Sequence, residues 1–217
     1  MVEIKIMKDV LEANNYIAKT INEDLTKRNI MMINIIGSPG AGKTSFILKT
    51  IEHLEVKCAV IEGDITSDID SRKVAAYGIP VVQINTGGSC HLNANMIDAA
   101  LKVIPLENAI IFVENVGNLV CPASFDIGED FKVALSSVTE GDDKPYKYPA
   151  IFKKAMVTVL NKIDLVRYVD FDRDYFYKGL KTLNPNGITF EVSSVLGDGI
   201  REWSEWLENQ LMQKYKK

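Results

Sequence analysis

The segment Ile33–Thr44 constrains the possible fold more than any other part of the chain. It reads I-N-I-I-G-S-P-G-A-G-K-T and matches the pattern G-x-x-x-x-G-K-[ST] of a phosphate-binding loop. An apolar run at 30–36 precedes the loop and apolar residues at helical spacing follow it, which predicts a strand, a loop and a helix. We therefore expect an α/β fold of the P-loop NTPase kind, in which a mostly parallel central β-sheet is flanked by helices on both faces.

The residue types of this loop suit phosphate binding. Glycines let successive backbone N–H groups point at phosphate oxygens, and the start of the following helix adds the positive end of its dipole. Lys43 is predicted to span the β- and γ-phosphates, and the Thr44 hydroxyl to bind the accompanying Mg²⁺. The alternative, a glycine-rich turn that binds nothing, does not account for this Lys-Thr pair. The predicted nucleotide contacts in the loop are Gly37, Ser38, Pro39, Gly40, Ala41, Gly42, Lys43, Thr44 and Ser45.

Composition limits the other possible functions. The chain has 217 residues and a formal net charge of −4, which fits one domain spanning 1–217 and argues against binding to nucleic acid. No apolar segment is long enough to span a membrane, and four of the first ten residues are charged, so we expect a cytoplasmic protein. An amphipathic helix is predicted over about 9–27, packed as a lid on the edge of the sheet.

Two acidic residues, one just after a predicted buried strand and one at the end of another, are candidate Mg²⁺ ligands. Asp64 could bind Mg²⁺ directly or through water, or it could cap a helix expected over 67–77, and the sequence favours neither interpretation. Glu114 begins the pattern E-x-x-G where GTPases usually carry D-x-x-G, so its carboxylate would reach Mg²⁺ through water and the N–H of Gly117 would sense the γ-phosphate. The predicted catalytic set is Lys43, Thr44, Asp64, Glu114 and Gly117.

The tetrapeptide Asn161–Asp164 reads N-K-I-D, which is a guanine-recognition motif. The Asp164 carboxylate can accept hydrogen bonds from guanine N1–H and the exocyclic amine, a pairing that adenine cannot supply. The stem of Lys162 would cover the base, and Asn161 would tie this loop to the phosphate-binding loop. Backbone N–H groups in the later S-S-V-L-G loop, those of Ser194 and Val195, are predicted to contact guanine O6. The expected nucleotides are therefore GTP and GDP rather than ATP.

Two of the three cysteines and one of the two histidines fall in loops that follow predicted strands. Cys90, His91 and Cys121 offer thiolate and imidazole ligands, which suit Zn²⁺ or Ni²⁺. Their spacing contains no C-x-x-C pair, so three unrelated residues are an equally good interpretation. Cys58, inside a buried strand, and His53, at a helix end, are interpreted as structural.

The remaining elements are predicted from apolar runs and helical spacing. The expected strands cover 57–62, 80–85, 109–114, 131–139, 155–160 and 188–192, and the expected helices 44–53, 92–102, 171–183 and 199–212. The segment 140–149 is predicted to be a charged surface loop, and Lys144 and Lys147 in it, together with Lys153 and Lys154 after it, are predicted to have solvated side chains. Trp203 and Trp206 of the last helix are interpreted as core residues.

Six motifs together resemble one known family. They are G-S-P-G-A-G-K-T, E-G-D at 62–64, G-G-S-C-H at 87–91, E-N-V-G-N-L-V-C-P at 114–122, F-D-I-G-E-D at 125–130 and N-K-I-D-L at 161–165. From Ile33 onward the chain resembles the HypB family, GTPases that assist nickel insertion into [NiFe] hydrogenase. The resemblance implies a SIMIBI-like G domain that hydrolyses GTP to GDP, a nucleotide-dependent homodimer, and Zn²⁺ or Ni²⁺ bound by Cys90, His91 and Cys121. It also implies hydrogenase maturation proteins and the hydrogenase large subunit as partners.

The sequence departs from some members of that family and leaves alternatives open. It lacks their N-terminal cysteine motif and histidine-rich tract, so a second high-affinity nickel site or a nickel store is not expected. Urease nickel chaperone GTPases look similar but carry C-P-H, where this chain has Ala123 after Cys121 and Pro122. A nucleotide-gated binding module without metal is another alternative, and an ATP-dependent kinase is disfavoured by N-K-I-D.

The short spacing between Gly117 and Cys121 suggests how nucleotide and metal could be coupled. The two residues are four positions apart, so a loop ordered by GTP would move Cys121 relative to Cys90 and His91. Gly117 is followed by Asn118 rather than a water-orienting glutamine, so we expect slow intrinsic hydrolysis.

Overall fold

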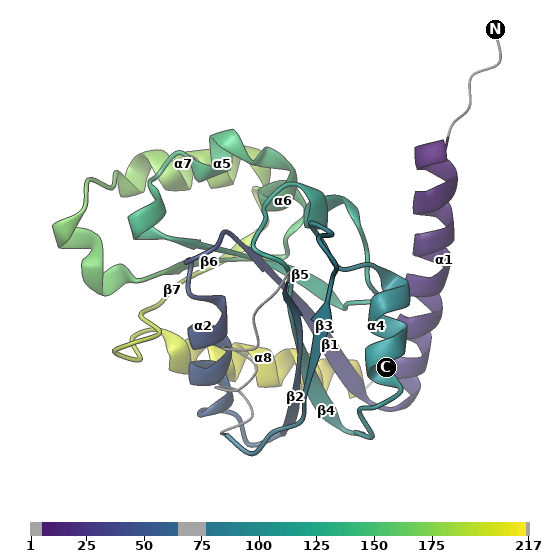
Figure 1. Ribbon diagram of the computed structural model, residues 1–217. Helices are drawn as coiled ribbons and strands as arrows, with labels where there is room; N and C mark the ends of the chain where they lie inside the picture. The colour runs from purple at the N-terminus through teal and green to yellow at the C-terminus, as the bar shows by residue number, and fades with distance from the viewer. Residues whose placement is uncertain (1–5, 65–76, 216–217) are drawn as a thin grey trace, which may run out of the picture.

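Strand β1 (Ile30–Gly37) lies at the centre of the sheet and is buried along its whole length. The computed structural model describes residues 6–64 and 77–215, with the further strands β2 (Lys57–Asp64), β3 (Val81–Asn85), β4 (Ala109–Glu114), β5 (Phe131–Ser137), β6 (Val157–Asn161) and β7 (Ile188–Glu191). The seven strands have the order β3-β2-β4-β1-β5-β6-β7, and all six pairings are parallel (Figure 1). The predicted P-loop NTPase fold is confirmed, and the described sheet is wholly rather than mostly parallel.

Helices cover both faces of this sheet. They are α1 (Ile6–Lys27), α2 (Lys43–Ile51), α4 (Ala94–Leu101), α5 (Lys144–Lys147), α6 (Pro149–Lys154), α7 (Arg173–Leu183) and α8 (Ile200–Tyr215), with 3₁₀ turns η1 (Cys121–Ser124), η2 (Val138–Glu140) and η3 (Ile163–Tyr168). Side chains along a strand alternate between its two faces. Met31 and Ile33 of β1 therefore pack with α2 and α8, whereas Ile30 and Met32 pack with α1 and α4 on the opposite face. Helices α6 and α7 enclose a third apolar cluster.

Helix α1 packs on a face of the sheet, and our prediction that it covers the edge was wrong. Its apolar residues Ile21 and Leu25 are buried in one cluster with Ile30 and Met32 of the central strand. Figure 1 shows α1 running beside α4. An edge strand would have presented mainly backbone groups, so the face removes more of the apolar stripe of α1 from water. The helix begins at Ile6, three residues before the predicted start.

The segment 140–149 is not the continuous loop that we predicted, because it contains α5 and the start of α6. Both helices have a proline in the first turn, Pro145 and Pro149, where the missing N–H removes no helical hydrogen bond. The sequence does not show that these prolines occupy the first turn of a helix, and without that information a proline indicates a loop. Lys147, Lys153 and Lys154 are exposed as expected, whereas Lys144 is half-buried with its ammonium 3.9 Å from Glu140.

The other predicted elements agree with the structure to within three residues at each end. The helix expected over 67–77 lies outside the described residues. Within the part of the chain that the structure describes, no helix combines the length and the apolar character needed to cross a membrane.

Trp203 of α8 anchors the core between α8 and α2. It is fully buried, and its Nε1–H donates to the Thr50 hydroxyl at 3.0 Å. We expect Trp203→Ala to lower the free energy of unfolding by about 3–5 kcal/mol, because it leaves a large cavity and removes the donor to the buried Thr50 hydroxyl. Urea unfolding of the purified protein measures this change.

Trp206 provides the control for that experiment. Its ring stacks on Trp203 with centroids 5.5 Å apart, but it is only half-buried. We expect Trp206→Ala to lower the free energy of unfolding by about 1–2 kcal/mol. Equal losses in the two variants would contradict the assignment of Trp203 as the principal aromatic contact of this core.

Candidate functional site

A cavity of about 540 Å³ lies at the edge of the sheet where the strands end. It is lined by the phosphate-binding loop and the first residues of α2, by Glu62 and Gly63 of β2, and by the segment 114–117 after β4. Lys162, after β6, also lines it. Parallel α/β sheets bind ligands at the carboxyl ends of their strands, and the volume is typical of a small-molecule site.

Gly42, directly before α2, is a position that requires glycine. Its φ is +93°, in the left-handed region, and a Cβ there would lie 2.6 Å from Asn161 Nδ2. Lys43 follows it and is buried, with Nζ donating to the carbonyl oxygens of Gly37 and Ser38 at 3.4 and 3.2 Å. The ammonium group therefore lies inside the loop that is predicted to bind phosphates.

The Thr44 hydroxyl and the Glu114 carboxylate meet in this cavity. The hydroxyl donates to Glu114 Oε1 at 3.1 Å, and both residues are buried. Hydroxyl and carboxylate oxygens are the groups that hold Mg²⁺ beside nucleotide phosphates, so this pair fits a magnesium ion. The fold thus brings together two predicted magnesium residues from α2 and β4.

A third acidic residue, Glu62, was missed by the sequence reasoning. It lies opposite Glu114 in the parallel register of β2 and β4, is buried, and lines the same cavity. Its place in the E-G-D motif at the end of a buried strand is the one signal that could have indicated it. Asp64 is the last residue of β2, and its side chain lies outside the described part of the structure, so its role stays a prediction.

Gly117 packs directly against the phosphate-binding loop. A Cβ on Gly117 would lie 2.8 Å from Pro39 Cγ and 3.1 Å from Pro39 N. A larger side chain would therefore push the two loops apart. Gly117, which is predicted to sense the γ-phosphate, is therefore placed so that a movement of the phosphate-binding loop would displace the segment after β4, and the reverse.

Asn161 joins three loops around the predicted base site. Its Nδ2 donates to the Ala41 carbonyl at 3.0 Å, which is the contact with the phosphate-binding loop that we expected. Its Oδ1 accepts from the N–H of Lys162 at 2.8 Å, and from the N–H and hydroxyl of Ser194 at 3.2 and 2.9 Å. The Ser194 N–H thus bonds Asn161, and the neighbouring Val195 is 77% exposed at the tip of its loop.

Lys162 and Asp164 complete the N-K-I-D segment. Lys162 adopts a left-handed conformation, with φ +61°, and its Nζ donates to the Gly40 carbonyl at 2.6 Å. Asp164 Oδ1 is buried and accepts no hydrogen bond from the residues that the structure describes. A buried acceptor without a donor is unfavourable, and the N–H groups of a guanine base are suitable partners.

Cys90, His91 and Cys121 come together, although they lie on two loops. Their potential ligand atoms are all within 4.8 Å of one another. Thiolate sulfurs bound at about 2.3 Å to one ion lie up to about 4.6 Å apart, so this cluster can hold Zn²⁺ or Ni²⁺ with little movement. The loops follow β3 and β4, which flank β2 in the sheet. The interpretation as three unrelated residues is therefore disfavoured by the geometry.

The surroundings of these side chains tune them as ligands. A hydrogen bond with Cys121, followed in importance by burial, raises the pKa of the Cys90 thiol, so metal binding there has to displace a proton. Burial lowers the pKa of His91, which keeps the imidazole neutral near pH 7 and able to bind a metal. Phe125 stacks on the His91 ring, with centroids 3.9 Å apart, and fixes its plane. The sequence reasoning assigned no role to Phe125.

The other cysteine and histidine lie elsewhere, as predicted. Burial raises the pKa of Cys58 to about 12, and the thiol donates to the Val56 carbonyl. His53 is exposed at the end of α2, where Nδ1 lies 2.9 Å from the Lys49 carbonyl oxygen. Both residues are structural in this arrangement.

Known proteins resemble the chain over almost its whole length. The family model described as CobW/HypB/UreG, nucleotide-binding domain, matches residues 31–190. The hydrogenase maturation factor HypB of Escherichia coli K12 is 45% identical over 213 residues, which cover 97% of this chain and 73% of that protein.

Two solved structures have the same fold and clear sequence similarity. Hydrogenase maturation factor HypB from Archaeoglobus fulgidus has a TM-score of 0.87 and 38% identity, covering 93% of this chain and 100% of the other. HypB from Helicobacter pylori in complex with nickel has a TM-score of 0.89 and 31% identity, covering 94% and 97%.

The cysteine cluster predicts a specific difference between two cysteine variants. Losing a group that only orients a metal ligand typically costs about 10–100-fold in metal affinity, so we expect Cys121→Ala to weaken Zn²⁺ binding by more than about 100-fold. Cys58→Ala is the matched control and should keep the wild-type affinity within about twofold, because its thiol lies outside the cluster. Competition titration against a chromophoric chelator measures both. Unchanged Zn²⁺ affinity in Cys121→Ala would remove Cys121 from the ligand set.

Proposed function

The chain belongs to the HypB family of hydrogenase maturation factors, and on that premise we propose that it is a GTP-hydrolysing metallochaperone that assists nickel insertion into [NiFe] hydrogenase. One observation carries the proposal. The segment 114–121 begins at the contact between Thr44 and Glu114 and ends at the cluster of Cys90, His91 and Cys121. A single loop thus connects the predicted nucleotide site to the predicted metal site.

The phosphate end of the site supports GTP hydrolysis. Lys43 would neutralise the phosphates, and Thr44, Glu114 and Asp64 would hold Mg²⁺ directly or through water. When bound, Mg²⁺ offsets the negative charge that develops on the phosphate oxygens. The Asn118 amide donates to the Cys90 carbonyl at 3.2 Å, so this group is already used in a bond to the other loop. It is therefore not placed to orient an attacking water, which supports slow intrinsic turnover.

The base end of the site supports GTP over ATP. Asp164 Oδ1, which accepts no hydrogen bond from the described residues, is an acceptor at the position where N-K-I-D proteins bind guanine. Asn161 and Lys162 hold this segment against the phosphate-binding loop, so base and phosphates would be bound by one connected structure.

The metal cargo is proposed to bind Cys90, His91 and Cys121. A tetrahedral site has room for a fourth ligand, which would be water or a group from a second copy of the chain. We propose a nucleotide-dependent homodimer that brings two such clusters together, since a twofold axis pairs identical surfaces. Hydrogenase maturation proteins and the hydrogenase large subunit are the proposed partners.

The proposed coupling uses the loop between Gly117 and Cys121. Gly117 lies against Pro39, so ordering of the phosphate-binding loop around the γ-phosphate would shift the backbone that leads to η1 and Cys121. Movement of one ligand relative to the other two would change the affinity for the metal.

Nucleotide preference tests the base site. We expect Asp164→Asn to weaken GTP binding by at least about 100-fold, because an amide donor would face the N–H donors of guanine. The affinities for GTP, ATP and xanthosine triphosphate are compared by titration. The variant should bind xanthosine triphosphate more tightly than the wild-type protein does, since xanthine presents a carbonyl in place of the guanine amine. Asp170→Asn, at an exposed position nearby, is the control. An Asp164→Asn protein with full GTP preference would contradict the assignment.

Metal affinity in the two nucleotide states tests the coupling itself. We expect the Ni²⁺ dissociation constants of the GTP-analogue and GDP complexes to differ by roughly 5–150-fold, the usual size of an allosteric coupling. Linkage requires that Ni²⁺ change the relative affinities for the nucleotides by the same factor, which a reciprocal titration checks. Lys43→Ala, with weakened nucleotide binding, should show one Ni²⁺ affinity under both conditions. Equal wild-type affinities in the two states would refute coupling through affinity.

A further inference from the structure

We propose that Asn115 is a positioning residue that links the nucleotide loop, which is the segment 114–117 after β4, to the backbone beside the proposed metal ligand His91. The inference rests on the proposed coupling of GTP and metal and names the contact that transmits it. Asn115 follows Glu114 at the end of β4, and 1% of it is exposed. Its N–H continues the sheet by donating to the Ile35 carbonyl at 3.0 Å, so the residue is held firmly to the central strand.

One oxygen atom of Asn115 bonds the backbone of both loops. Oδ1 accepts from the N–H of Leu92 at 3.1 Å and from the N–H of Val116 at 3.0 Å. Leu92 directly follows His91, and Val116 directly precedes Gly117. The bond from Leu92 therefore joins the metal-ligand loop to the nucleotide loop, and it shares its acceptor with the bond from Val116 inside the nucleotide loop.

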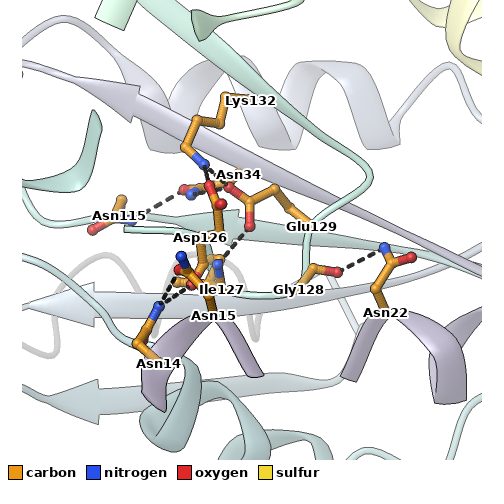
Figure 2. A network of polar contacts seen from close by, with 10 residues as sticks. All are labelled: Asn14, Asn15, Asn22, Asn34, Asn115, Asp126, Ile127, Gly128, Glu129 and Lys132. Carbon is orange, nitrogen blue, oxygen red and sulfur yellow. Dashed lines mark hydrogen bonds and ion pairs between the residues drawn. The ribbon is translucent and has the colours of Figure 1, made fainter. Parts of the chain in front are cut away.

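The buried network around Asn115 determines which way its amide faces (Figure 2). Lys132 forms a close ion pair with Glu129, whose carboxylate can only accept hydrogen bonds. Asn34 must therefore direct its nitrogen to Glu129, at 3.1 Å, and its oxygen to Asn115, at 3.0 Å. The nitrogen of Asn115 is used in that second bond, which leaves its oxygen for the two loops.

Leu92 is held in place from several directions. Its side chain is fully buried, and a Cβ on Gly63 of β2 would lie 2.7 Å from Leu92 Cγ. Two residues later, the N–H of Ala94 donates to Asn14 Oδ1 of α1 at 2.9 Å. The backbone that follows His91 is thus fixed to β2 and α1, and it cannot shift far as a unit.

A movement of Val116 therefore changes the restraint on this backbone. Two movements are possible when Gly117 approaches a γ-phosphate. If the N–H of Val116 moves away from Asn115, Oδ1 keeps the N–H of Leu92 as its one backbone donor. If the Asn115 side chain turns with Val116, the buried N–H of Leu92 loses its acceptor. Buried N–H groups without acceptors are strongly disfavoured. In either case the state of the nucleotide loop alters how rigidly His91 is held.

A second bond between the same loops is a poorer candidate. Asn118 Nδ2 donates to the Cys90 carbonyl at 3.2 Å, but this contact is exposed. Water can replace either partner of an exposed hydrogen bond, whereas both bonds to Asn115 Oδ1 are buried. We therefore assign the link to Asn115.

The test compares Asn115→Ala with the matched variant Asn14→Ala. Asn14 is also a buried asparagine, and its side chain bonds the Ala94 N–H, the Asp126 carbonyl and the Asn15 side chain, none of which belongs to the nucleotide loop. Figure 2 shows its bonds to Asp126 and Asn15. For each protein, the Ni²⁺ dissociation constant is measured with GTP analogue and with GDP, and the ratio of the two is compared. We expect the ratio in Asn115→Ala to move toward unity by at least about threefold, with the part carried by the movement of Cys121 remaining, and the ratio in Asn14→Ala to stay within about twofold of wild type.

The outcomes distinguish this inference from the proposed function. A wild-type ratio of one contradicts the coupling of GTP and metal, and the role of Asn115 with it. A wild-type ratio different from one that persists unchanged in Asn115→Ala overturns the role of Asn115 alone. An equal loss in both variants also overturns it, because general loosening of the ligand loop would then suffice.

Hydrogen exchange of the wild-type protein keeps the inference testable if Asn115→Ala does not fold. The Leu92 amide shares its acceptor with Val116, so we expect its exchange rate to differ by about fivefold or more between the GTP-analogue and GDP complexes, the effect of about one hydrogen bond. The same Leu92 exchange rate in both complexes overturns the inference.

Discussion

The parallel pairing of β1 with β4 and β5 is the constraint on which the rest of the molecule depends. Because the paired strands all run in one direction, their carboxyl ends and the loops that follow lie at one edge of the sheet. The register sets Ile35 opposite Glu114 and Gly37 opposite Leu135, so the phosphate-binding loop starts where β4 and β5 end. The Thr44 hydroxyl, at the start of α2, is therefore close enough to the end of β4 to donate to Glu114 Oε1 at 3.1 Å. Gly37 admits the close approach, since a Cβ there would lie 2.6 Å from the Leu135 carbonyl oxygen.

A buried polar network supports this edge from within the core. Asn34 interrupts the apolar run of β1, and the ion pair of Lys132 with Glu129 lies next to it. Burial alone would lower the pKa of Lys132, but Glu129 and Asp126 outweigh it and raise the pKa above its ordinary value, so the ammonium stays charged. Buried ion pairs contribute little net stability. The structural role of the Lys132–Glu129 pair is to set the direction of the hydrogen bonds that run through Asn34 to Asn115.

The sequence was sufficient for features that depend on neighbouring residues. A phosphate-binding loop needs a strand end, glycines and a helix start in succession, and all three were visible around Gly42. Features that depend on distant residues were not predictable. The apolar stripe of α1 fits an edge or a face equally well until the strand order is known. From the residues alone the same holds for Cys90 and Cys121, whose loops meet because β3 and β4 flank β2, and it was the family resemblance that implied a shared site. The bond between Leu92 and Asn115 spans 23 residues and had no local signal.

In the proposed coupling, the three proposed metal ligands would follow the nucleotide loop in two different ways. Cys121 lies four residues beyond Gly117 on the same stretch of backbone, so it changes position when that stretch changes its path. His91 lies on a separate loop that β2 and α1 hold in place, so a nucleotide can alter its restraint through Asn115 but can move it little. A joint movement of all three ligands would leave the metal affinity unchanged. In the proposed mechanism the metal affinity would change because Cys121 moves relative to Cys90 and His91, which stay in place. A ligand pair that is held more rigidly also loses less conformational freedom when the metal binds.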